Sequence, residues 1–321
     1  MATSTTDEIL SEPLNFIRIF KDGRFERLSI PNIVPAGIDH STGVNSKDVV
    51  FSPEPNTFAR LYIPKTATPN HKLPLLIFYH GGGFVIESAS SSSYHNFLNL
   101  IVSESNVVAV SVNYRLAPEF RLPVAYDDSW EAIKWVAEHV NEKGPEPWLN
   151  EYADLQKIFI GGDSAGGNIS HHMAIRFGSD SPAGLRFMGA ILLHPYFWGS
   201  ERVGTEPDWM TPKLIGELND LWLSAVTNPG SVGLDDPFNN PGMDPKLADL
   251  GCSKILFCIS GDDFMRERVR NYKNLIEKSG WKGDLEVVED KEEKHVYFLN
   301  KPSSPNACTL RNRICAFINM A

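Results

Sequence analysis

The 321-residue sequence predicts an α/β fold in which helices cover both faces of a central, mostly parallel sheet. Continuously apolar runs of strand length, such as LLIFY, VVAVSVNY and ILFCI, recur along the chain. This composition is typical of strands that are buried on both faces. Segments with helical spacing alternate with these runs, which indicates strand–helix units in a parallel sheet. Ligands of such sheets bind at the carboxyl ends of the strands.

The elements follow in order from this pattern. FIRIF and RFERL flank a Lys21-Asp22-Gly23 turn and predict a β-hairpin. In the segment 125–141, apolar residues such as Trp130 and Ile133 share one side of a helix. We expect strands at 58–63, 75–79, 107–114, 157–161, 188–194, 255–259 and 285–288, and helices at 125–141, 165–177, 265–278 and 305–320.

The alternation fails between Trp198 and Leu250, which interrupts the strand pattern. This region holds a helical run at 213–226 and the Pro/Gly/Asn-rich stretch PFNNPGMDP. We therefore expect residues of about 198–250 to form a cap over the end of the sheet. No internal repeat or linker divides the chain, so we predict a single domain over residues 1–321.

Composition narrows the class of function. The formal net charge is −10 and the pI about 5.4, which argues against nucleic-acid binding and against anionic membrane surfaces. No apolar run reaches the roughly 18 residues of a membrane span, and MATSTTDEIL lacks the features of a signal peptide. We therefore expect a cytoplasmic protein with neither a nucleic-acid nor a membrane partner. Four cysteines at these spacings suit neither a disulfide scaffold nor a zinc site, and we expect no metal or organic cofactor.

A candidate nucleophile stands in Gly162-Asp163-Ser164-Ala165-Gly166. This G-x-S-x-G motif follows a predicted strand and precedes a predicted helix, as a nucleophile elbow does. Small flanking residues allow a sharp turn that exposes the serine oxygen. Two other interpretations are a glycine-packed turn and a phosphate-binding loop. The second lacks both the G-x-G-x-x-G spacing and a Walker lysine.

A second motif, His80-Gly81-Gly82-Gly83, follows the predicted strand 75–79 and is of the HGGG type. Consecutive glycines let backbone N–H groups come close to a reacting oxygen. We expect Gly82 and Gly83 to form an oxyanion hole together with the N–H of Ala165. His80 is expected to order the loop by hydrogen bonding.

The acid and the base follow from chain order, which in this arrangement is Ser, then Asp or Glu, then His. Two neighbouring acids, Asp262 and Asp263, follow the predicted strand 255–259. We favour Asp263 and keep Asp262 as the alternative. His295 is the one histidine beyond the last predicted strand, and it is therefore the candidate base.

These motifs resemble the hormone-sensitive-lipase-like group of hydrolases, and most closely the plant carboxylesterases. The resemblance rests on HGGGF, NYRLAPE, PVAYDD, GDSAGGN, DFMRER and HVYF, and it covers nearly the whole chain. It implies an α/β-hydrolase fold with an eight-stranded sheet and a helical cap built by residues of about 1–40 and 198–250. It also supports Asp263, which begins the matching D-x-x-R-x-R stretch.

The resemblance implies a serine carboxylesterase that hydrolyses a small to medium apolar ester through an acyl-enzyme on Ser164. The chain also resembles 2-hydroxyisoflavanone dehydratases and alkaloid cyclases, so a lyase or cyclase of plant specialised metabolism is the first alternative. It resembles the gibberellin receptors as well, which makes a non-catalytic small-molecule receptor the second. His295 is present, and this counts against a receptor.

An aromatic pocket is a further expectation, and its alternative is that the same side chains form the core of the cap. The partner expected in it is a small ester or related metabolite, and the sequence leaves the oligomeric state open. The candidate substrate-binding residues are Phe84, Tyr196, Phe197, Trp198 and Trp222, with Trp209 as a further aromatic candidate.

Overall fold

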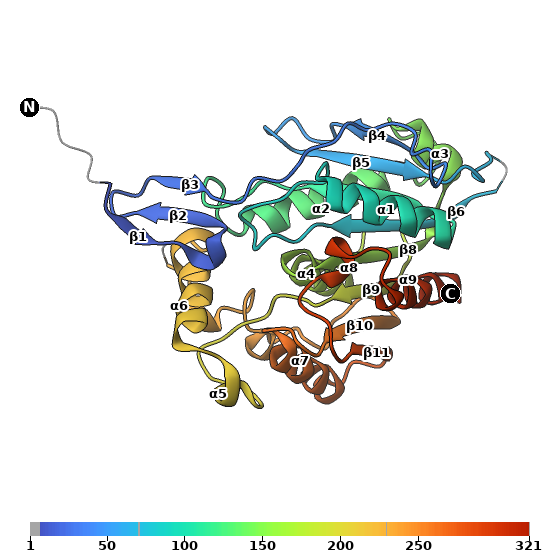
Figure 1. Cartoon of the computed structure of the whole chain (residues 1–321). Coiled ribbons are helices and arrows are strands. Elements are labelled where there is room, and N and C mark those ends of the chain that lie inside the picture. Colours follow the sequence, from blue (N-terminus) through green and yellow to red (C-terminus); the bar gives the residue numbers. More distant parts are fainter. Residues whose placement is uncertain (1–6, 70, 229, 321) are drawn as a thin grey trace, which may run out of the picture.

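A sheet of eight strands in the order β11-β10-β9-β8-β6-β7-β5-β4 runs through the computed structural model, which describes residues 7–69, 71–228 and 230–320 (Figure 1). The β4–β5 and β5–β7 pairs are antiparallel, and all other neighbours are parallel. The predicted mostly parallel sheet is thus confirmed. Its strands are β4 Asn45–Val49, β5 Phe58–Ile63, β6 Leu73–Tyr79, β7 Val108–Asn113, β8 Ala153–Asp163, β9 Phe187–Leu193, β10 Lys254–Ser260 and β11 Asp284–Asp290.

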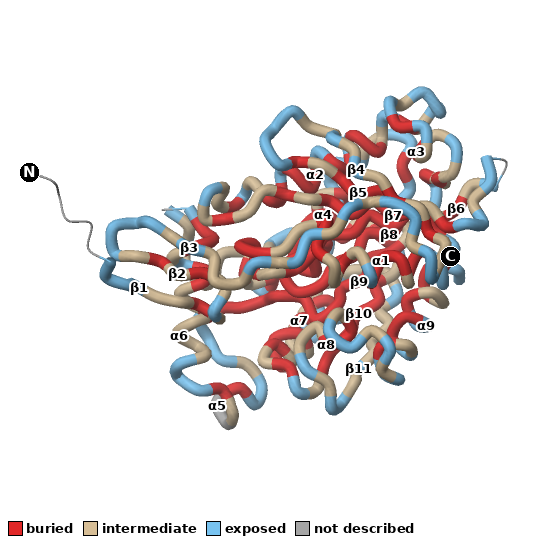
Figure 2. Tube along the Cα trace, turned by 45° about the horizontal axis from the view of Figure 1, so that its top comes forward, coloured by how far each residue is buried: buried red, intermediate tan, exposed pale blue. Residues whose placement is uncertain are grey.

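Two hydrophobic cores lie on the two faces of this sheet. Along β6, Leu75 and Ile77 enter one core while Leu76 and Phe78 enter the other, because successive strand side chains point to opposite faces. Figure 2 shows the buried chain concentrated along the central strands. The first face is covered by α2 Val124–Ala137, α4 Ala165–Ser179 and α7 Arg266–Ser279, and the second by α1 Ser92–Ser105, α8 Tyr297–Asn300 and α9 Pro305–Asn319.

Most predicted elements are present with ends shifted by a few residues, but several elements of the main body were not predicted, among them one long helix, one edge strand and one short helix. The helix α1 begins in a run of serines, the edge strand β4 has the polar sequence NSKDV, and the short helix α3 (Pro147–Tyr152) precedes β8. The sequences of β4 and α3 carry weak hydrophobic patterns, so tertiary packing determines them. In α1 the buried residues Tyr94, Phe97, Leu98, Ile101 and Val102 do follow helical spacing, so a signal for this helix was present and was missed.

The amino-terminal segment forms a separate three-stranded sheet of β1 (Ile9–Ser11), β2 (Ile17–Phe20) and β3 (Phe25–Arg27). The hairpin of β2 and β3 was predicted, whereas β1 was not. Residues 1–6, part of the segment expected to lack a signal peptide, lie outside the described residues. The turn Pro13–Asn15 packs against α6 (Pro212–Asp220). This contact joins the small sheet, which belongs to the first predicted cap segment, to the second one, residues 198–250 (Figure 1).

The second cap segment contributes no strand within the described part of residues 198–250. The predicted helix 213–226 is divided, because α6 ends at Asp220 and a π-helical stretch follows. No helix among the described residues is long and apolar enough to cross a membrane. The elements of this segment are α5 Glu206–Trp209, α6 Pro212–Asp220, the π-helical stretch Leu221–Val226 and the short 3₁₀ turns Gly233–Asp235 and Pro241–Met243.

Arg27 ties the small amino-terminal sheet to the main body. Its guanidinium donates to the carbonyl oxygens of Val85 (2.7 Å) and Ala117 (3.1 Å) and binds both carboxylate oxygens of Glu119 (2.7 and 2.6 Å). Arg27→Ala should lower the free energy of unfolding by about 1–2 kcal/mol. Most of this loss comes from the carbonyls of Val85 and Ala117, which lose their hydrogen-bond donor, because the ion pair with Glu119 is partly exposed and therefore contributes little. Urea unfolding measures this. Arg202→Ala, at an exposed position, is the control, and an equal effect of both variants would contradict this anchoring role.

Candidate active site

Ser164 stands at the turn between β8 and α4, at the carboxyl edge of the sheet. Its backbone has φ 51° and ψ −118°, a conformation that costs free energy for any residue with a side chain. Hydrogen bonds hold the turn in place: the Ser164 amide donates to the carbonyl of Leu193 (3.0 Å), and the Tyr196 amide donates to the carbonyl of Ser164 (2.8 Å). Neighbouring strand β9 therefore stabilises the strained turn.

The glycines around Ser164 are required by close backbone contact. A Cβ on Gly166 would lie 1.9 Å from the carbonyl oxygen of Tyr79, and one on Gly162 would lie 2.4 Å from the carbonyl oxygen of Gly166. No side chain fits at either position. The turn is thus packed directly against the end of β6, where the glycine-rich loop begins.

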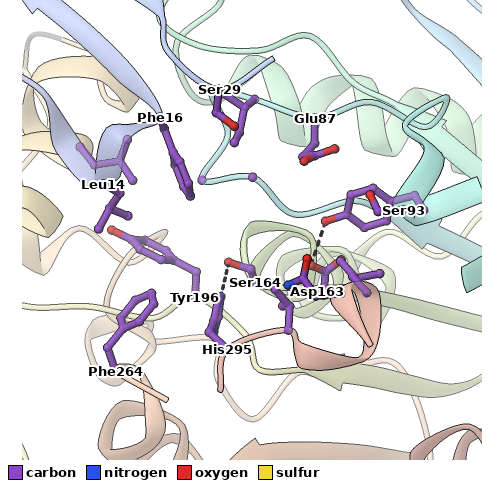
Figure 3. Close-up of a pocket in the computed structure, with 18 residues that line it drawn as sticks. Leu14, Phe16, Ser29, Glu87, Ser93, Asp163, Ser164, Tyr196, Phe264 and His295 are labelled. Atoms are coloured by element: carbon purple, nitrogen blue, oxygen red, sulfur yellow. Dashed lines mark hydrogen bonds between the residues drawn. The ribbon is translucent and has the colours of Figure 1, made fainter. Parts of the chain in front are cut away.

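Ser164, His295 and Asp263 form a chain of hydrogen bonds, and Figure 3 shows the one between Ser164 and His295. Oγ of Ser164 lies 3.0 Å from Nε2 of His295, and Nδ1 of His295 lies 2.7 Å from Oδ2 of Asp263. Asp263 follows β10 and His295 follows β11, so the parallel sheet brings together residues that are far apart in sequence. Asp262 is exposed, and its amide donates to the carbonyl of Glu293. The structure therefore places Asp263, and not Asp262, against the histidine.

Charge pairing overcomes burial at this chain of hydrogen bonds. Burial acts to raise the pKa of Asp263, but the charge and hydrogen bond of His295 bring that pKa below its ordinary value. Burial acts to lower the pKa of His295, but Asp263, and more weakly Asp163, raise it above its ordinary value. Asp263 is therefore ionised at neutral pH and accepts from Nδ1–H of His295. Nε2 is then left to accept the proton of the Ser164 hydroxyl.

His194 supports the loop that carries His295, a role that the sequence did not indicate. The amide of Val296 donates to Nδ1 of His194 (2.9 Å), and this nitrogen lies 3.9 Å from Oδ2 of Asp263. Burial lowers the pKa of His194 to about 4, so its ring is neutral at physiological pH. The ring therefore fixes the loop around His295 through the Val296 amide, and because it is neutral it does not form an ion pair with Asp263 in place of His295.

The loop after β6 brings Gly82 and Gly83 to the same cavity as Ser164. Gly82 has φ 91°, and a Cβ there would lie 2.3 Å from the carbonyl oxygen of Ile86. Among the described residues, neither glycine amide has an intramolecular acceptor, and Ala165 is the first residue of α4, so its N–H has no acceptor within the helix. His80 orders this loop, since its Nδ1 lies 2.9 Å from the carbonyl oxygen of Gly81.

Asp163 and Tyr94 connect the glycine-rich loop to the Ser164 turn. The amide of Gly81 donates to the Tyr94 oxygen (2.8 Å), and the Tyr94 hydroxyl donates to Oδ2 of Asp163 (2.9 Å). Burial raises the pKa of Asp163 to about 7, although the hydrogen bond from Tyr94 opposes this shift. Tyr94 belongs to α1, a helix that the sequence analysis missed, so this link was not predicted.

A cavity of about 400 Å³ opens above Ser164 and His295, within the range of small-molecule sites (Figure 3). Both cap segments contribute to its wall, the first through Leu14, Phe16 and Ser29 and the second through Leu221. The apolar part of the wall consists of Leu14, Phe16, Ile86, Tyr196, Leu221, Phe264, Val296 and Leu299.

The predicted aromatic pocket needs a correction, because of its five candidates only Tyr196 lines this cavity. The other four do not line it. Trp222 stacks on Tyr196 (6.3 Å between ring centroids), and Phe84 meets the edges of both rings. Phe197 stacks on Tyr272, whereas Trp198 lies beneath the guanidinium of Arg268. Trp209, which likewise does not line the cavity, lies beneath the guanidinium of Arg266.

Two groups of described residues have side chains of the kind that bind metals. His194, Asp263 and His295 form the first, and hydrogen bonds to Val296 and Ser164 already engage both histidines. The second consists of His171, His172 and Asp244. Here Nδ1 of His171 lies 2.8 Å from the Tyr272 hydroxyl, and Nε2 of His172 lies 3.3 Å from the carbonyl of Phe238. The expected absence of a metal stays a prediction.

Comparison with known proteins extends the resemblance. The family described as alpha/beta hydrolase fold matches residues 76–299. The chain is 44% identical to probable carboxylesterase 5 of Arabidopsis thaliana, over 97% of this chain and 98% of that protein. It is 40% identical to 2-hydroxyisoflavanone dehydratase of Glycine max, over 97% and 99%. Among solved structures, a thermophilic carboxylesterase cloned from a metagenomic library superposes with a TM-score of 0.69 at 25% identity, over 89% of this chain and 90% of that one.

The close contact of Gly166 with the carbonyl oxygen of Tyr79 predicts that a methyl group added at position 166 lowers the stability of the fold. Gly166→Ala should destabilise the protein by about 3 kcal/mol or more, because the backbone of β6 would have to move away from the turn. The control is Gly216→Ala in α6, where a Cβ meets nothing within 4 Å. Alanine there should leave stability unchanged or raise it by about 0.5–1 kcal/mol. Urea unfolding compares the two, and a Gly166→Ala protein as stable as the wild type would refute the close contact.

Proposed function

Because this chain belongs to the α/β-hydrolase fold family, together with plant proteins named carboxylesterases, we propose that it is a serine carboxylesterase. Its substrate is a small to medium, largely apolar carboxylic ester. The observation that carries the proposal is the hydrogen-bond chain from Ser164 through His295 to Asp263 at the floor of the cavity. A serine hydroxyl hardly ionises in neutral water and is therefore a weak nucleophile. The hydrogen-bonded His295 supplies a base within reach of the Ser164 proton.

In the acylation step, Oγ of Ser164 attacks the ester carbonyl carbon while Nε2 of His295 takes the hydroxyl proton. The imidazolium so formed is stabilised by the ionised Asp263. The tetrahedral intermediate then collapses: its bond to the alcohol oxygen breaks, and His295 returns the proton to the departing alcohol. The acyl group is left on Ser164 as a new ester.

Deacylation repeats these proton movements with water. His295 removes a proton from the water as its oxygen attacks the acyl carbon, and then gives the proton back to Oγ of Ser164. The carboxylic acid leaves and the serine is regenerated. In both steps the amides of Gly82, Gly83 and Ala165 are proposed to donate to the oxyanion. Each such donor contributes on the order of 3–4 kcal/mol to transition-state stabilisation.

A second candidate function is a lyase or cyclase reaction of plant specialised metabolism in the same cavity. The relatives named 2-hydroxyisoflavanone dehydratase, aligned over nearly their whole length, favour it. Such an elimination needs a base to remove a proton, a role open to His295, but it needs no acyl-enzyme. Ser164→Ala separates the two functions, because it removes the nucleophile and leaves the base. A non-catalytic receptor would show turnover of neither kind.

We further propose that the protein works in the cytoplasm. Its four cysteines are free, which suits a reducing compartment. One relative is named a mitochondrial protein. In fractionated cells that express this chain, recovery in the cytosolic fraction would support the proposal, and recovery in the mitochondrial fraction would contradict it.

The acyl-enzyme step predicts burst kinetics. With p-nitrophenyl acetate and butyrate, the wild type should release a burst of p-nitrophenol equal to the enzyme concentration whenever deacylation is slower than acylation. Ser164→Ala should lose the burst and reduce kcat by a factor on the order of 10⁵ or more. Ser103→Ala, at an exposed position in α1, is the matched control. Steady turnover by Ser164→Ala would overturn the mechanism.

The raised pKa of His295 predicts where activity is lost in acid. The histidine must be neutral to accept the serine proton, so kcat/KM falls as the pH drops through this pKa. The acid limb should therefore lie above about 6.5, the value of an unperturbed histidine. Asp263→Asn removes the contribution that raises the pKa, so the limb should move to lower pH while kcat/KM falls by a factor on the order of 10³–10⁴. Asp262→Asn should keep the wild-type profile, and an equal loss there would favour Asp262 as the acid.

A further inference from the structure

The cavity above Ser164 has two chemically different sides. In Figure 3, Phe16, Tyr196 and Phe264 lie on one side of Ser164, whereas Glu87 and Ser93 lie on the other. An ester whose carbonyl carbon is at Ser164 must extend in two directions from that atom. One part of the substrate therefore meets aromatic rings, and the other part meets a carboxylate.

Three polar atoms in the cavity wall have no hydrogen-bond partner among the described protein groups: Oδ1 of Asp163, Oε2 of Glu87 and the Tyr196 hydroxyl. The second oxygen of Asp163 is held by Tyr94, and a tyrosine hydroxyl can either donate or accept. An ionised Glu87 can only accept, and its Oε2 is shielded from water. An unpaired buried acceptor is unfavourable, and Oε2 itself is out of reach of a bound molecule. A donor on a ligand would therefore meet this carboxylate through its other oxygen, Oε1, which is not among the shielded unpaired atoms of this cavity-lining residue.

The position of Glu87 is also maintained against backbone strain. Its φ is 77°, a left-handed conformation that is unusual for a residue with a long side chain. Its Cγ lies 3.0 Å from the point where a Cβ on Gly82 would be, so the side chain packs over the glycine-rich loop. Burial raises the pKa of Glu87, and the hydrogen bond with Ser91 offsets part of this shift. Strain, burial and an unpaired oxygen thus coincide at one residue beside the proposed oxyanion site.

We propose that Glu87 is a specificity-determining residue that accepts a hydrogen bond from a hydroxyl group of the substrate. The substrates are then hydroxylated esters that are apolar on one side of the ester bond and carry a hydroxyl on the other. This inference rests on the proposed esterase function and narrows its substrate class. A neutral hydroxyl fits better than an ammonium group, because a cation would have to be desolvated in a cavity whose wall is mainly apolar.

Matched esters test this proposal from both sides of the ester bond. On the alcohol side, 2-(4-hydroxyphenyl)ethyl acetate is compared with 2-phenylethyl acetate. On the acyl side, methyl 3-(4-hydroxyphenyl)propanoate is compared with methyl 3-phenylpropanoate. The 4-methoxy analogues of both pairs add an acceptor without a donor. In at least one series, the wild type should prefer the hydroxyl ester about ten- to hundredfold in kcat/KM over both analogues.

The variants are judged by this ratio within each protein, which cancels general losses of activity. Glu87→Met keeps the length of the side chain without an acceptor, and its ratio should fall to about one. Glu87→Gln keeps an acceptor oxygen and should retain part of the preference. Glu138→Met, at an exposed position after α2, is the matched control and should keep the wild-type ratio. A wild-type ratio near one in both series, or an unchanged ratio in Glu87→Met, overturns the proposal.

Failure of this inference can be distinguished from failure of the esterase function. If the plain phenyl esters are hydrolysed in a Ser164-dependent way and no hydroxyl preference appears, the esterase stands and the role of Glu87 is rejected. Dissociation constants of the same esters for Ser164→Ala, alone and combined with Glu87→Met, measure recognition without turnover. A hydroxyl preference that disappears in the double variant supports Glu87 even if hydrolysis is absent, and its persistence rejects Glu87.

Discussion

The close contact between Gly166 and the carbonyl of Tyr79 is the constraint on which the site depends. It brings the Ser164 turn against the end of β6, where the loop with Gly82 begins. A serine in a strained conformation and the glycine-rich loop are thereby held at a short, rigid separation. Neither can move without displacing a strand in the middle of the sheet, and such rigidity is what preorganised electrostatic stabilisation requires. The strain at Ser164 is tolerated because hydrogen bonds to β9 maintain the turn.

Three carboxyl groups near one cavity differ in their pKa because their surroundings differ. Asp263 is buried but faces His295, and its pKa is lowered. Asp163 is buried, and its pKa rises to about 7 because burial outweighs both the hydrogen bond from Tyr94 and the charge of His295. Glu87 is partly buried with weak compensation, and its pKa is also raised. One acid therefore pairs with the histidine, the second links two loops, and the third lines the cavity. The same side-chain chemistry thus supports separate roles in one small volume.

The aromatic residues of the cap illustrate the difference between being near a site and lining it. Tyr196 reaches the cavity, but Trp222 and Phe84 form a layer behind it and fix the orientation of the tyrosine ring. The wall is completed by Phe16 from the small amino-terminal sheet. Two segments far apart in sequence thus share one apolar surface, and their mutual packing determines the shape available to a substrate.

Local sequence alone determined the sharp turns and the buried strands of this protein. Glycines at sharp backbone turns and continuous apolar runs for buried strands are readable along the chain, because each reflects a short-range steric or hydrophobic requirement. The order of Ser164, an aspartate and His295 was readable because this order is known for the motif. Tertiary structure alone decided between Asp262 and Asp263 on physical grounds, placed Tyr94 between two loops, and oriented Glu87 toward the cavity. These outcomes depend on contacts between segments distant in sequence, and on burial, which no local pattern of residues encodes.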